Sequence, residues 1–339
     1  MFNRGENVNI RERTENMEQK ILSEYASLAK NSKGRKKEEQ ECELRTVYQR
    51  DRDRIIHCKS FRRLKHKTQV FISPEGDHYR TRLTHTLEVS QIARTIAMAL
   101  RLNGDLTEAI SLGHDLGHTP FGHAGESALN KISKNGFKHF EQSVRVAEVL
   151  EKNGKGLNLT YEVLDGILCH TRGEEAKTPE GRIVKLADRI AYINHDIDDA
   201  IRAGVLNESD LPKNALSILG DSKTKRIGTL IKSVVDNSDG LNICMGDEVV
   251  EAFNIIHKFM FDTVYLDSSA KSEERKIPIL IEMLYNYFKS NNEKLPEDIK
   301  CIADKEGIDR AVCDYIAGMT DHFAVNMFKS IFIPTSWGI

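Results

Sequence analysis

The sequence lacks the features that would place it among nucleic-acid-binding, secreted or membrane proteins. Its 339 residues carry a formal net charge of only −2, so overall charge does not favour nucleic acid or an anionic membrane as a partner. The six cysteines include no CxxC pair, which argues against a zinc knuckle and a disulfide framework and fits a reducing compartment. No apolar run reaches the roughly eighteen residues of a membrane span, and MFNRGENVNIRERTENMEQK contains no signal segment. We therefore expect a cytoplasmic protein without a membrane partner.

Proline and alternating strand patterns are also scarce. The chain has seven prolines, and its apolar residues recur at helical spacing, as Ile277, Leu280, Ile281 and Leu284 do. These patterns predict an all-α protein. We divide it into a polar N-terminal arm (1–42), a motif-rich catalytic core (43–215) and a C-terminal helical region packed on that core (216–339).

One short segment concentrates the titratable groups. Gly113 to Glu126 reads GHDLGHTPFGHAGE and contains three histidines, an aspartate and a glutamate among several turn-forming residues. The adjacent His114 and Asp115 offer an imidazole nitrogen and a carboxylate oxygen, which divalent metals accept together. This segment predicts an enzyme whose remaining ligands come from elsewhere in the chain.

Helical spacing supplies the other candidate ligands. His85 begins the face that carries Val89, Ile92 and Ile96, so its side chain points inward. We expect a third ligand-bearing helix over about 183–199, in which Asp188 shares an inward stripe with apolar residues.

His114 follows a second helix, which the sequence marks by Asp105 and Glu108. This pair has the spacing of a capping box, and Ile110 lies one turn before His114. His114 therefore lies on the buried stripe, with Asp115 beside it.

A single buried histidine is usually a hydrogen-bonded core residue, but this combination is different. Two inward aspartates would be costly to bury without a cation between them. We therefore predict one divalent metal ion bound by His85, His114, Asp115 and Asp188. Mn or Mg suits two carboxylates and a phosphate, the two imidazoles admit Fe, Co, Ni or Zn, and a second, substrate-bridging Mg is compatible with this site.

The order His, His-Asp, Asp is that of the HD metal-dependent phosphohydrolases, and longer segments narrow the resemblance. The sequence resembles the deoxynucleoside triphosphate triphosphohydrolases, the dGTPase-like branch, in RDRDRIIHCKSFRRLKHKTQVF, YRTRLTHTLEVSQIAR, LTYEVLDGILCHT, KLADRIAYINHDIDDA and DYIAGMTD. The resemblance implies an HD-domain helical bundle with additional C-terminal helices. It also implies that one water attacks the α-phosphorus of a dNTP, which releases the deoxynucleoside and inorganic triphosphate.

The resemblance also implies residue roles. His123 and Glu126 match a catalytic dyad, and they lie three residues apart on one helical face, with His118 as a further catalytic histidine. Whether His123 acts as base, acid or nucleophile is left open. The residues expected to bind substrate are Gln69, Arg63, Arg82, His139, Arg189, Tyr192 and Asp196.

Two rival functions remain open. The site could serve another HD phosphohydrolase: a 5′-nucleotidase, a cyclic-nucleotide phosphodiesterase or a guanosine tetraphosphate hydrolase. The chain could also be a non-catalytic nucleotide-binding or single-stranded-DNA-binding protein. The resemblance further implies a homo-oligomer and allows a nucleotide activator. His66, His78 and His170 can line the pocket or have only packing roles.

Overall fold

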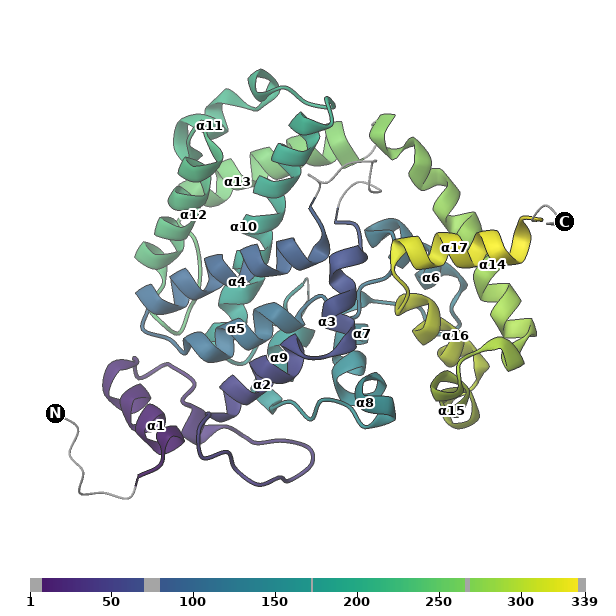
Figure 1. The fold of residues 1–339 in the computed structure, drawn as a ribbon. Helices are drawn as coiled ribbons and strands as arrows, with labels where there is room; N and C mark the ends of the chain where they lie inside the picture. The colour runs from purple at the N-terminus through teal and green to yellow at the C-terminus, as the bar shows by residue number, and fades with distance from the viewer. Residues whose placement is uncertain (1–7, 70–79, 172, 266–268, 335–339) are drawn as a thin grey trace, which may run out of the picture.

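The computed structural model describes residues 8–69, 80–171, 173–265 and 269–334, and this part of the chain is helical throughout (Figure 1). No β-strand forms within these ranges, where strand-like pairing is limited to the isolated bridges Arg35–Thr160 and Thr68–Thr81. The prediction of an all-α fold is confirmed.

The helices of the N-terminal half are α1 (Ile10–Ile21), α2 (Val47–Ile56), α3 (Lys59–Arg63), α4 (Arg82–Ala99), α5 (Gly104–Gly113), α6 (Gly122–Ile132), α7 (His139–Arg145), α8 (Glu151–Gly154) and α9 (Tyr161–Leu168). Those that follow are α10 (Pro179–Arg202), α11 (Lys213–Leu219), α12 (Lys223–Asn237), α13 (Asp247–Met260), α14 (Ile277–Ser290), α15 (Glu297–Glu306), α16 (Ile308–Ala317) and α17 (Asp321–Phe332). Short 3₁₀ and π turns connect several of them, η1 (Ala29–Asn31) and η3 (Val146–Leu150) among them.

A first apolar cluster is built around α4, α5 and α10. These helices pack against one another and against α2 and α9 (Figure 1). The predicted stripe Val89, Ile92 and Ile96 on α4 is fully buried in this cluster. Burial of such a stripe is the main source of stability for a surface helix, since intrinsic helix propensity alone is weak.

A second apolar cluster joins α6 to α14, α16 and α17, which lie together on the right of Figure 1. Phe121 and Leu129 pack there with residues such as Ile281 and Ile316. Helices α11 to α13 instead pack in the first cluster with α10. The domain boundary at residues 215 and 216 stays a prediction. The second cluster combines α6 with helices that follow Val264, so the apolar packing does not divide at a single point of the chain.

The segment that contains α1 is attached to the body by buried hydrogen bonds. Ser27 donates through its backbone N–H and its hydroxyl to Glu180 at the start of α10, with distances of 3.0 and 2.8 Å. Arg35 forms an ion pair with Asp51, whose side chain is fully buried in α2. Some polar residues of this segment therefore attach it to the rest of the protein.

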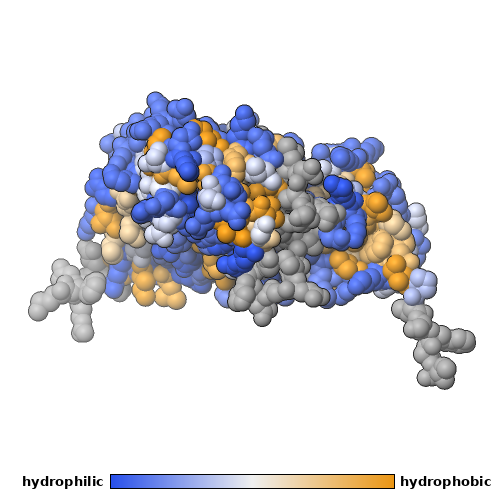
Figure 2. Space-filling model, turned by 90° about the horizontal axis from the view of Figure 1, so that it is seen from above, coloured by the Kyte–Doolittle hydropathy of each residue, from blue (hydrophilic) through white to orange (hydrophobic). Residues whose placement is uncertain are grey.

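The face seen from above is largely hydrophilic, with scattered apolar residues rather than one continuous apolar patch (Figure 2). Within the described ranges, no helix has both the length and the apolar character that crossing a membrane requires.

Candidate functional site

Three helices of the first cluster bring the four predicted metal ligands together. His85 lies near the start of α4, His114 directly follows the last residue of α5, and Asp188 lies within α10. His85, His114 and Asp115 are each at most 3% exposed. The sequence predicted inward positions for all four; His85, His114 and Asp115 are buried, and the side chain of Asp188 is 24% exposed.

The start of the second helix differs from the sequence prediction. The cap of α5 is Asn103, whose side chain accepts from the backbone N–H groups of Asp105 and Leu106 at 3.1 and 3.2 Å. The proposed capping box of Asp105 and Glu108 was wrong, because both carboxylates face Arg52 of α2 instead. A long-range ion pair thus overrides a local pattern.

The distances within this ligand set suit a metal ion. His85 Nε2 lies 3.0 Å from Asp188 Oδ1, and His114 Nε2 lies 3.9 Å from the same oxygen and 3.6 Å from Asp115 Oδ1. His114 Nδ1 lies 2.6 Å from the carbonyl oxygen of Ser111, so Nδ1 donates and Nε2 carries the lone pair. This Nε2 is buried without a hydrogen-bond partner. A buried, unpartnered imidazole nitrogen beside two carboxylates fits a divalent cation, and the cluster could hold one.

Both carboxylates remain ionised in this environment. Burial alone would raise the pKa of Asp188, but the hydrogen bond with His85 and the charge of His114 lower it to about 2. Burial likewise opposes ionisation of Asp115, yet His114 and Arg82 hold the pKa of Asp115 well below its usual value. The centre is therefore ready to accept a cation at neutral pH.

Arg82 is buried beside this centre. Its Nη1 donates to Asp115 Oδ2 at 2.8 Å, while Nε and Nη2 are buried without hydrogen-bond partners. Two unused guanidinium donors that remain buried can bind an anion brought to the metal centre.

A second group of polar side chains continues from Asp115 toward α6 and α7. The Glu126 carboxylate accepts from His139, whose Nδ1 lies 2.9 and 3.0 Å from its two oxygens and whose backbone N–H lies 2.9 Å away. The hydrogen-bonding partner of Glu126 is thus His139, whereas His123 experiences only the charge of the Glu126 carboxylate. The assignment of a His123–Glu126 catalytic dyad stays a prediction.

Two further histidines of this group, His118 and His123, are neutral at pH 7. The rings of His118 and His139 stack with centroids 4.5 Å apart, and those of His118 and His123 meet edge to face at 5.7 Å. Burial and the charge of Arg82 keep the pKa of His118 well below its usual value. Desolvation and the charge of the same arginine also lower the pKa of His123 below its ordinary value, and this residue keeps exposed surface. Both imidazoles are therefore proton acceptors at pH 7.

Four residues carried over as substrate contacts have different surroundings. Gln69 is buried, and its side-chain carbonyl oxygen lacks a hydrogen-bond partner. On α10, Asp196 is fully buried, and the ring of the half-buried Tyr192 lies 6.3 Å from that of His123. Arg189 is exposed, with its guanidinium 5.1 Å from the Phe253 ring centre. Their substrate roles stay predictions.

Comparison with known proteins identifies the family. The model of the HD domain matches residues 82–193, which include all four metal-ligand candidates, and that of the phosphohydrolase-associated domain matches residues 243–330. A deoxyguanosinetriphosphate triphosphohydrolase-like protein from Caldanaerobacter subterraneus subsp. tengcongensis is 59% identical, with 97% of each chain covered. The chain belongs to the deoxyguanosinetriphosphate triphosphohydrolase-like (dGTPase-like) family.

A second relative agrees with this dGTPase-like assignment. A protein of the same name from Clostridium perfringens strain 13 is 52% identical, with 96% of this chain and 98% of the relative covered. A crystal structure of a hypothetical protein from Aquifex aeolicus superposes with a TM-score of 0.46 at 19% identity, and 83% of this chain and 71% of that chain are covered. The chain is thus a hydrolase of the dGTPase-like, HD-domain family.

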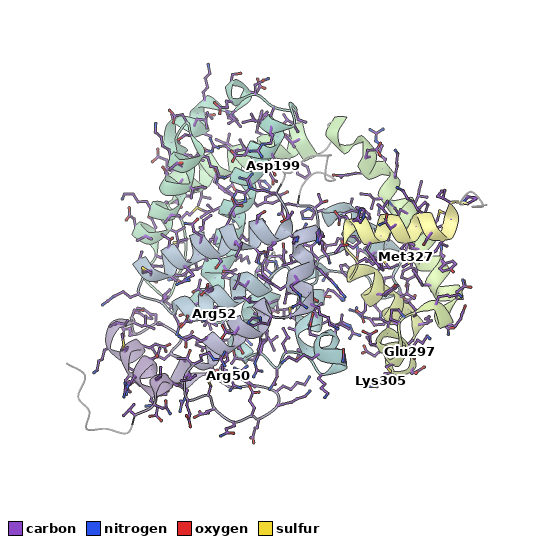
Figure 3. The ribbon with its side chains drawn as sticks, in the orientation of Figure 1. Arg50, Arg52, Asp199, Glu297, Lys305 and Met327 are labelled. Carbon is purple, nitrogen blue, oxygen red and sulfur yellow. The ribbon has the colours of Figure 1, made fainter. Side chains whose placement is uncertain are left out.

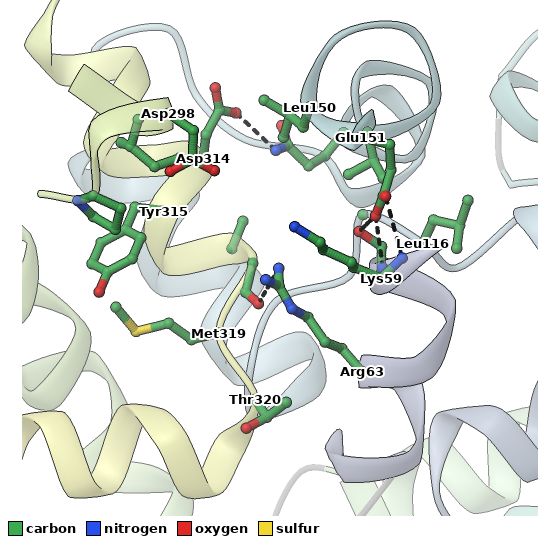
Figure 4. Close-up of a pocket in the computed structure, with 18 of the residues that line it drawn as sticks. Lys59, Arg63, Leu116, Leu150, Glu151, Asp298, Asp314, Tyr315, Met319 and Thr320 are labelled. Atoms are coloured by element: carbon green, nitrogen blue, oxygen red, sulfur yellow. Dashed lines mark hydrogen bonds between the residues drawn. The ribbon is translucent and has the colours of Figure 1, made fainter. Parts of the chain in front are cut away.

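Arg63 lies outside the histidine group of this dGTPase-like chain. It borders a cavity of about 380 Å³ between α3, the α7–α8 region and the C-terminal helices, where it donates to the carbonyl oxygen of Gly318 at 3.1 Å (Figure 4). Leu116 and Gly117 line the same cavity, whereas the four candidate metal ligands do not. The cavity thus borders the end of the turn that follows α5 (residues 114–117, the HD turn). The contact of Arg63 with substrate stays a prediction.

Two other arginines of the segment RDRDRIIHCKSFRRLKHKTQVF form contacts within the protein. Arg50 and Arg52 project from α2 near the lower left of the molecule (Figure 3), where Arg50 donates to the carbonyl oxygen of Gln40 and Arg52 pairs with Asp105. These two arginines therefore stabilise the fold through contacts within the protein.

Sequence reasoning left one contributor to the site unassigned. His170, just after α9, is 2% exposed, and its ring lies 5.0 Å from that of His114 and 5.3 Å from that of His139. The segment LTYEVLDGILCHT contained this histidine, but no local pattern shows that the end of α9 meets α5 and α7. His66 borders a shallow surface cavity beside α3, and His78 lies outside the described residues.

Proposed function

We propose that this chain hydrolyses deoxynucleoside triphosphates to the deoxynucleoside and inorganic triphosphate, with dGTP among its substrates. The name shared by its relatives, deoxyguanosinetriphosphate triphosphohydrolase-like protein, supports this substrate class. The observation that carries the proposal is the continuity of the site. Asp115 belongs both to the set with His85 and His114 and to the set with His139 and His170. A metal centre and a second group of imidazoles therefore share one carboxylate.

His85, His114, Asp115 and Asp188 would hold the metal ion. When bound, a divalent ion there supplies Lewis-acid polarisation of a phosphoryl oxygen and helps to ionise water. Arg82 orients the substrate phosphates with the two guanidinium nitrogens that Asp115 leaves free. This arrangement favours an anionic substrate over a neutral ester.

The histidines provide the proton transfers. His123, neutral at pH 7, accepts a proton as water attacks the α-phosphorus, and the bond from phosphorus to the 5′-oxygen breaks. Glu126 orients His139 and favours its charged form, so His139 can hold positive charge near the triphosphate that forms. The proton that His123 takes from the attacking water passes to the departing 5′-oxygen, which closes the proton balance.

Helix α10 carries the residues that we expect to select deoxyribose over ribose. Asp188, Tyr192 and Asp196 lie at successive turns of this helix, so one element carries a metal ligand and two sugar-side groups. Tyr192 approaches His123 edge to face, where its ring would crowd a ribose 2′-hydroxyl. We expect dGTP to be hydrolysed at least about tenfold faster than GTP, which corresponds to about 1.4 kcal/mol of discrimination.

Product analysis tests the function. The purified protein is incubated with Mn²⁺ and each dNTP, singly and in pairs, and the phosphorus products are resolved by ³¹P NMR. The expected products are inorganic triphosphate and deoxynucleoside. In H₂¹⁸O the label should enter the triphosphate, because water adds to the α-phosphorus. Deoxynucleoside monophosphate with pyrophosphate, or label in the nucleoside, would contradict the proposal.

A further inference from the structure

A carboxylate of the C-terminal region contacts the turn that carries the catalytic histidines. This turn, residues 118–121, connects the HD turn to α6. Asp321, the first residue of α17, accepts from the backbone N–H of Phe121 through Oδ1 at 2.9 Å. Its Oδ2 accepts from the backbone N–H of Thr68 at 2.9 Å and also from the Thr68 hydroxyl. One carboxylate therefore joins α17 to two segments that lie 200 and 253 residues away in the sequence.

Lys67 forms a second link between the same parts of the molecule. Its side chain is buried, and its Nζ donates to the carbonyl oxygen of Ala317 at 2.9 Å and to that of His118. Ala317 ends α16, and His118 begins the 118–121 turn. Burial and the charge of Arg63 lower the pKa of Lys67 to about 7. An apolar side chain would be less costly to bury, so stability alone does not favour a lysine at this position.

The backbone is strained where the turn meets α6. Phe121 has a φ of 62° and Gly122 a φ of 57°, both in the left-handed region. For Phe121 this conformation is unfavourable, and it persists where the surrounding structure fixes it. The hydrogen bond to Asp321 does so, and His123 follows two residues later. Asp321 thus holds the point at which the chain turns into the helix that carries His123.

The segment that donates these side-chain hydrogen bonds also supports Arg82. Thr68 pairs with Thr81 in an isolated bridge, and the backbone N–H of Arg82 donates to the carbonyl oxygen of Lys67 at 3.0 Å. Gln69, a predicted substrate contact, directly follows Thr68. The segment 67–69 therefore connects the 118–121 turn and the C-terminal region to the arginine that faces the metal centre.

We propose that Lys67 and Asp321 are positioning residues of the reaction, which fix the 118–121 turn and thereby place the catalytic histidines against the substrate phosphates. Both act through hydrogen bonds to the backbone of the turn and need no contact with substrate. The phosphohydrolase-associated region, which contains Asp321, thus takes part in building the active site. This proposal rests on the proposed function, because the groups that it positions are those of the proposed hydrolysis.

Kinetics of two side-chain replacements of similar size test the positioning role. Lys67→Met removes the ammonium group, and Asp321→Asn replaces one accepting oxygen with a donor. With dGTP and Mn²⁺, each full-length variant should lose about 10- to 100-fold in kcat, with KM changed less than about threefold, because misplaced groups mainly slow the chemical step. In the His123→Ala background, Asp321→Asn should cost less than about threefold more, because the histidine that it positions is already absent.

Histidine resonances give a readout that does not depend on activity. In the metal-free protein with ¹⁵N-labelled histidine, both variants should shift the ring signals of His118 and His123 and leave that of the exposed His57 unchanged. Circular dichroism and thermal unfolding check that each variant is folded. If neither variant folds, Thr68→Val, which removes a single hydroxyl donor to Asp321, should still lower kcat at least about threefold.

A carboxylate elsewhere in the C-terminal region provides the matched control. Asp309 on α16 also accepts from a backbone N–H beyond α6, that of Lys134 at 3.0 Å, and from Lys289 at 2.9 Å. Asp309→Asn should keep kcat within about twofold and leave the signals of His118 and His123 in place. A kcat within about twofold in folded Lys67→Met and Asp321→Asn, or an equal loss in Asp309→Asn, would overturn the positioning role.

The two readouts separate this proposal from the proposed function. Failure of the unaltered protein to hydrolyse any dNTP would remove the function, and the ring signals would still show whether Lys67 and Asp321 fix the turn. Triphosphate release with unchanged kcat and unchanged ring signals in the variants would keep the function and remove the positioning role.

Discussion

At the scale of single residues, the partner of Glu126 decides how the site transfers protons. Glu126 forms hydrogen bonds with His139, while the resemblance assigns it to His123. A carboxylate can orient only the imidazole that it contacts, whereas its charge acts on both. The two assignments therefore predict different coupling between substitutions.

We expect Glu126→Gln to lower kcat by about 100-fold, because the amide orients His139 less well and no longer favours its charged form. If Glu126 acts through His139, the double variant Glu126→Gln/His139→Gln should lose little more than His139→Gln alone. The effects of Glu126→Gln and His123→Ala should instead multiply. Each pair forms a double-mutant cycle of the unaltered protein, the two single variants and the double variant. Steady-state kinetics on these proteins measures the coupling of Glu126 to His139 and to His123. Coupling confined to the His123 cycle would restore the dyad suggested by the resemblance.

At the scale of elements, the close approach of the HD turn to α7 requires a glycine. A Cβ at Gly117 would lie 2.2 Å from the backbone nitrogen of Ser143 and 2.7 Å from the carbonyl oxygen of His139. Backbone atoms cannot move aside as a flexible side chain can. The Gly117 N–H also donates to the Ser143 hydroxyl at 2.9 Å, which ties the turn to α7.

Gly117→Ala should therefore destabilise the fold by about 3 kcal/mol, at the upper end of overpacking effects. Gly104→Ala is the matched control, because a Cβ at the start of α5 meets nothing within 4 Å. That control should be neutral or gain less than about 1 kcal/mol. Urea unfolding followed by circular dichroism gives both values, and equal stability of the two variants would show that the turn has room to move.

Burial of a carboxylate makes the attachment of α1 depend on pH. Glu18 accepts from the backbone N–H of Ala29 at 2.8 Å, and burial raises its pKa to about 7. The charges of Asp105 and Glu15 raise it further, whereas Asn103 opposes the shift. A raised folded-state pKa gives stability that is complete below the unfolded value near 4.5 and is lost as pH rises to about 7.

We expect Glu18→Gln to remove this dependence, because an amide of the same size does not ionise. Relative to the unaltered protein, the variant should gain stability between pH 5 and about 7, by on the order of 2 kcal/mol at the upper end. Melting temperatures of the two proteins across this range test the sign. A difference that does not change with pH would mean that Glu18 titrates at its ordinary value.

Helical periodicity predicted the positions of the candidate metal ligands, because His85 and Asp188 share stripes with apolar residues of α4 and α10, and His114 directly follows α5. His85 shares its face with Val89 and Ile92, and this spacing is visible without tertiary contacts. The cap of α5, the partner of Glu126 and the meeting of His139 with His170 were not predictable in this way. They depend on segments distant in sequence, and the position of one helix end relative to another has no local signal.

At the scale of the whole molecule, the site lies where the two apolar clusters meet. His85, His114 and Asp188 belong to elements of the first cluster, while His123 and Glu126 lie on α6, which packs in the second. The spacing between the two groups therefore depends on contacts that hold the clusters together.

Asp314 provides one of these contacts from a buried side chain. Its side chain is fully buried in α16 and accepts from Arg145 at 2.7 and 2.9 Å, and also from Gln142 at 2.8 Å, both on α7. Arg145 also pairs with Glu306 at the end of α15, whose side chain is 39% exposed. One arginine therefore has a buried and an exposed partner.

Removing the charge of each partner separates their contributions. Asp314→Asn should cost about 3 kcal/mol, because Arg145 loses its buried counter-charge, while Glu306→Gln should cost less than about 1 kcal/mol, because water screens the exposed pair. Urea unfolding gives the two free energies, and hydrogen exchange should show lost protection in α16 and α7 only for Asp314→Asn. Equal costs would mean that the buried pair adds nothing beyond a surface pair, so the apolar contacts alone would hold α16 to α7.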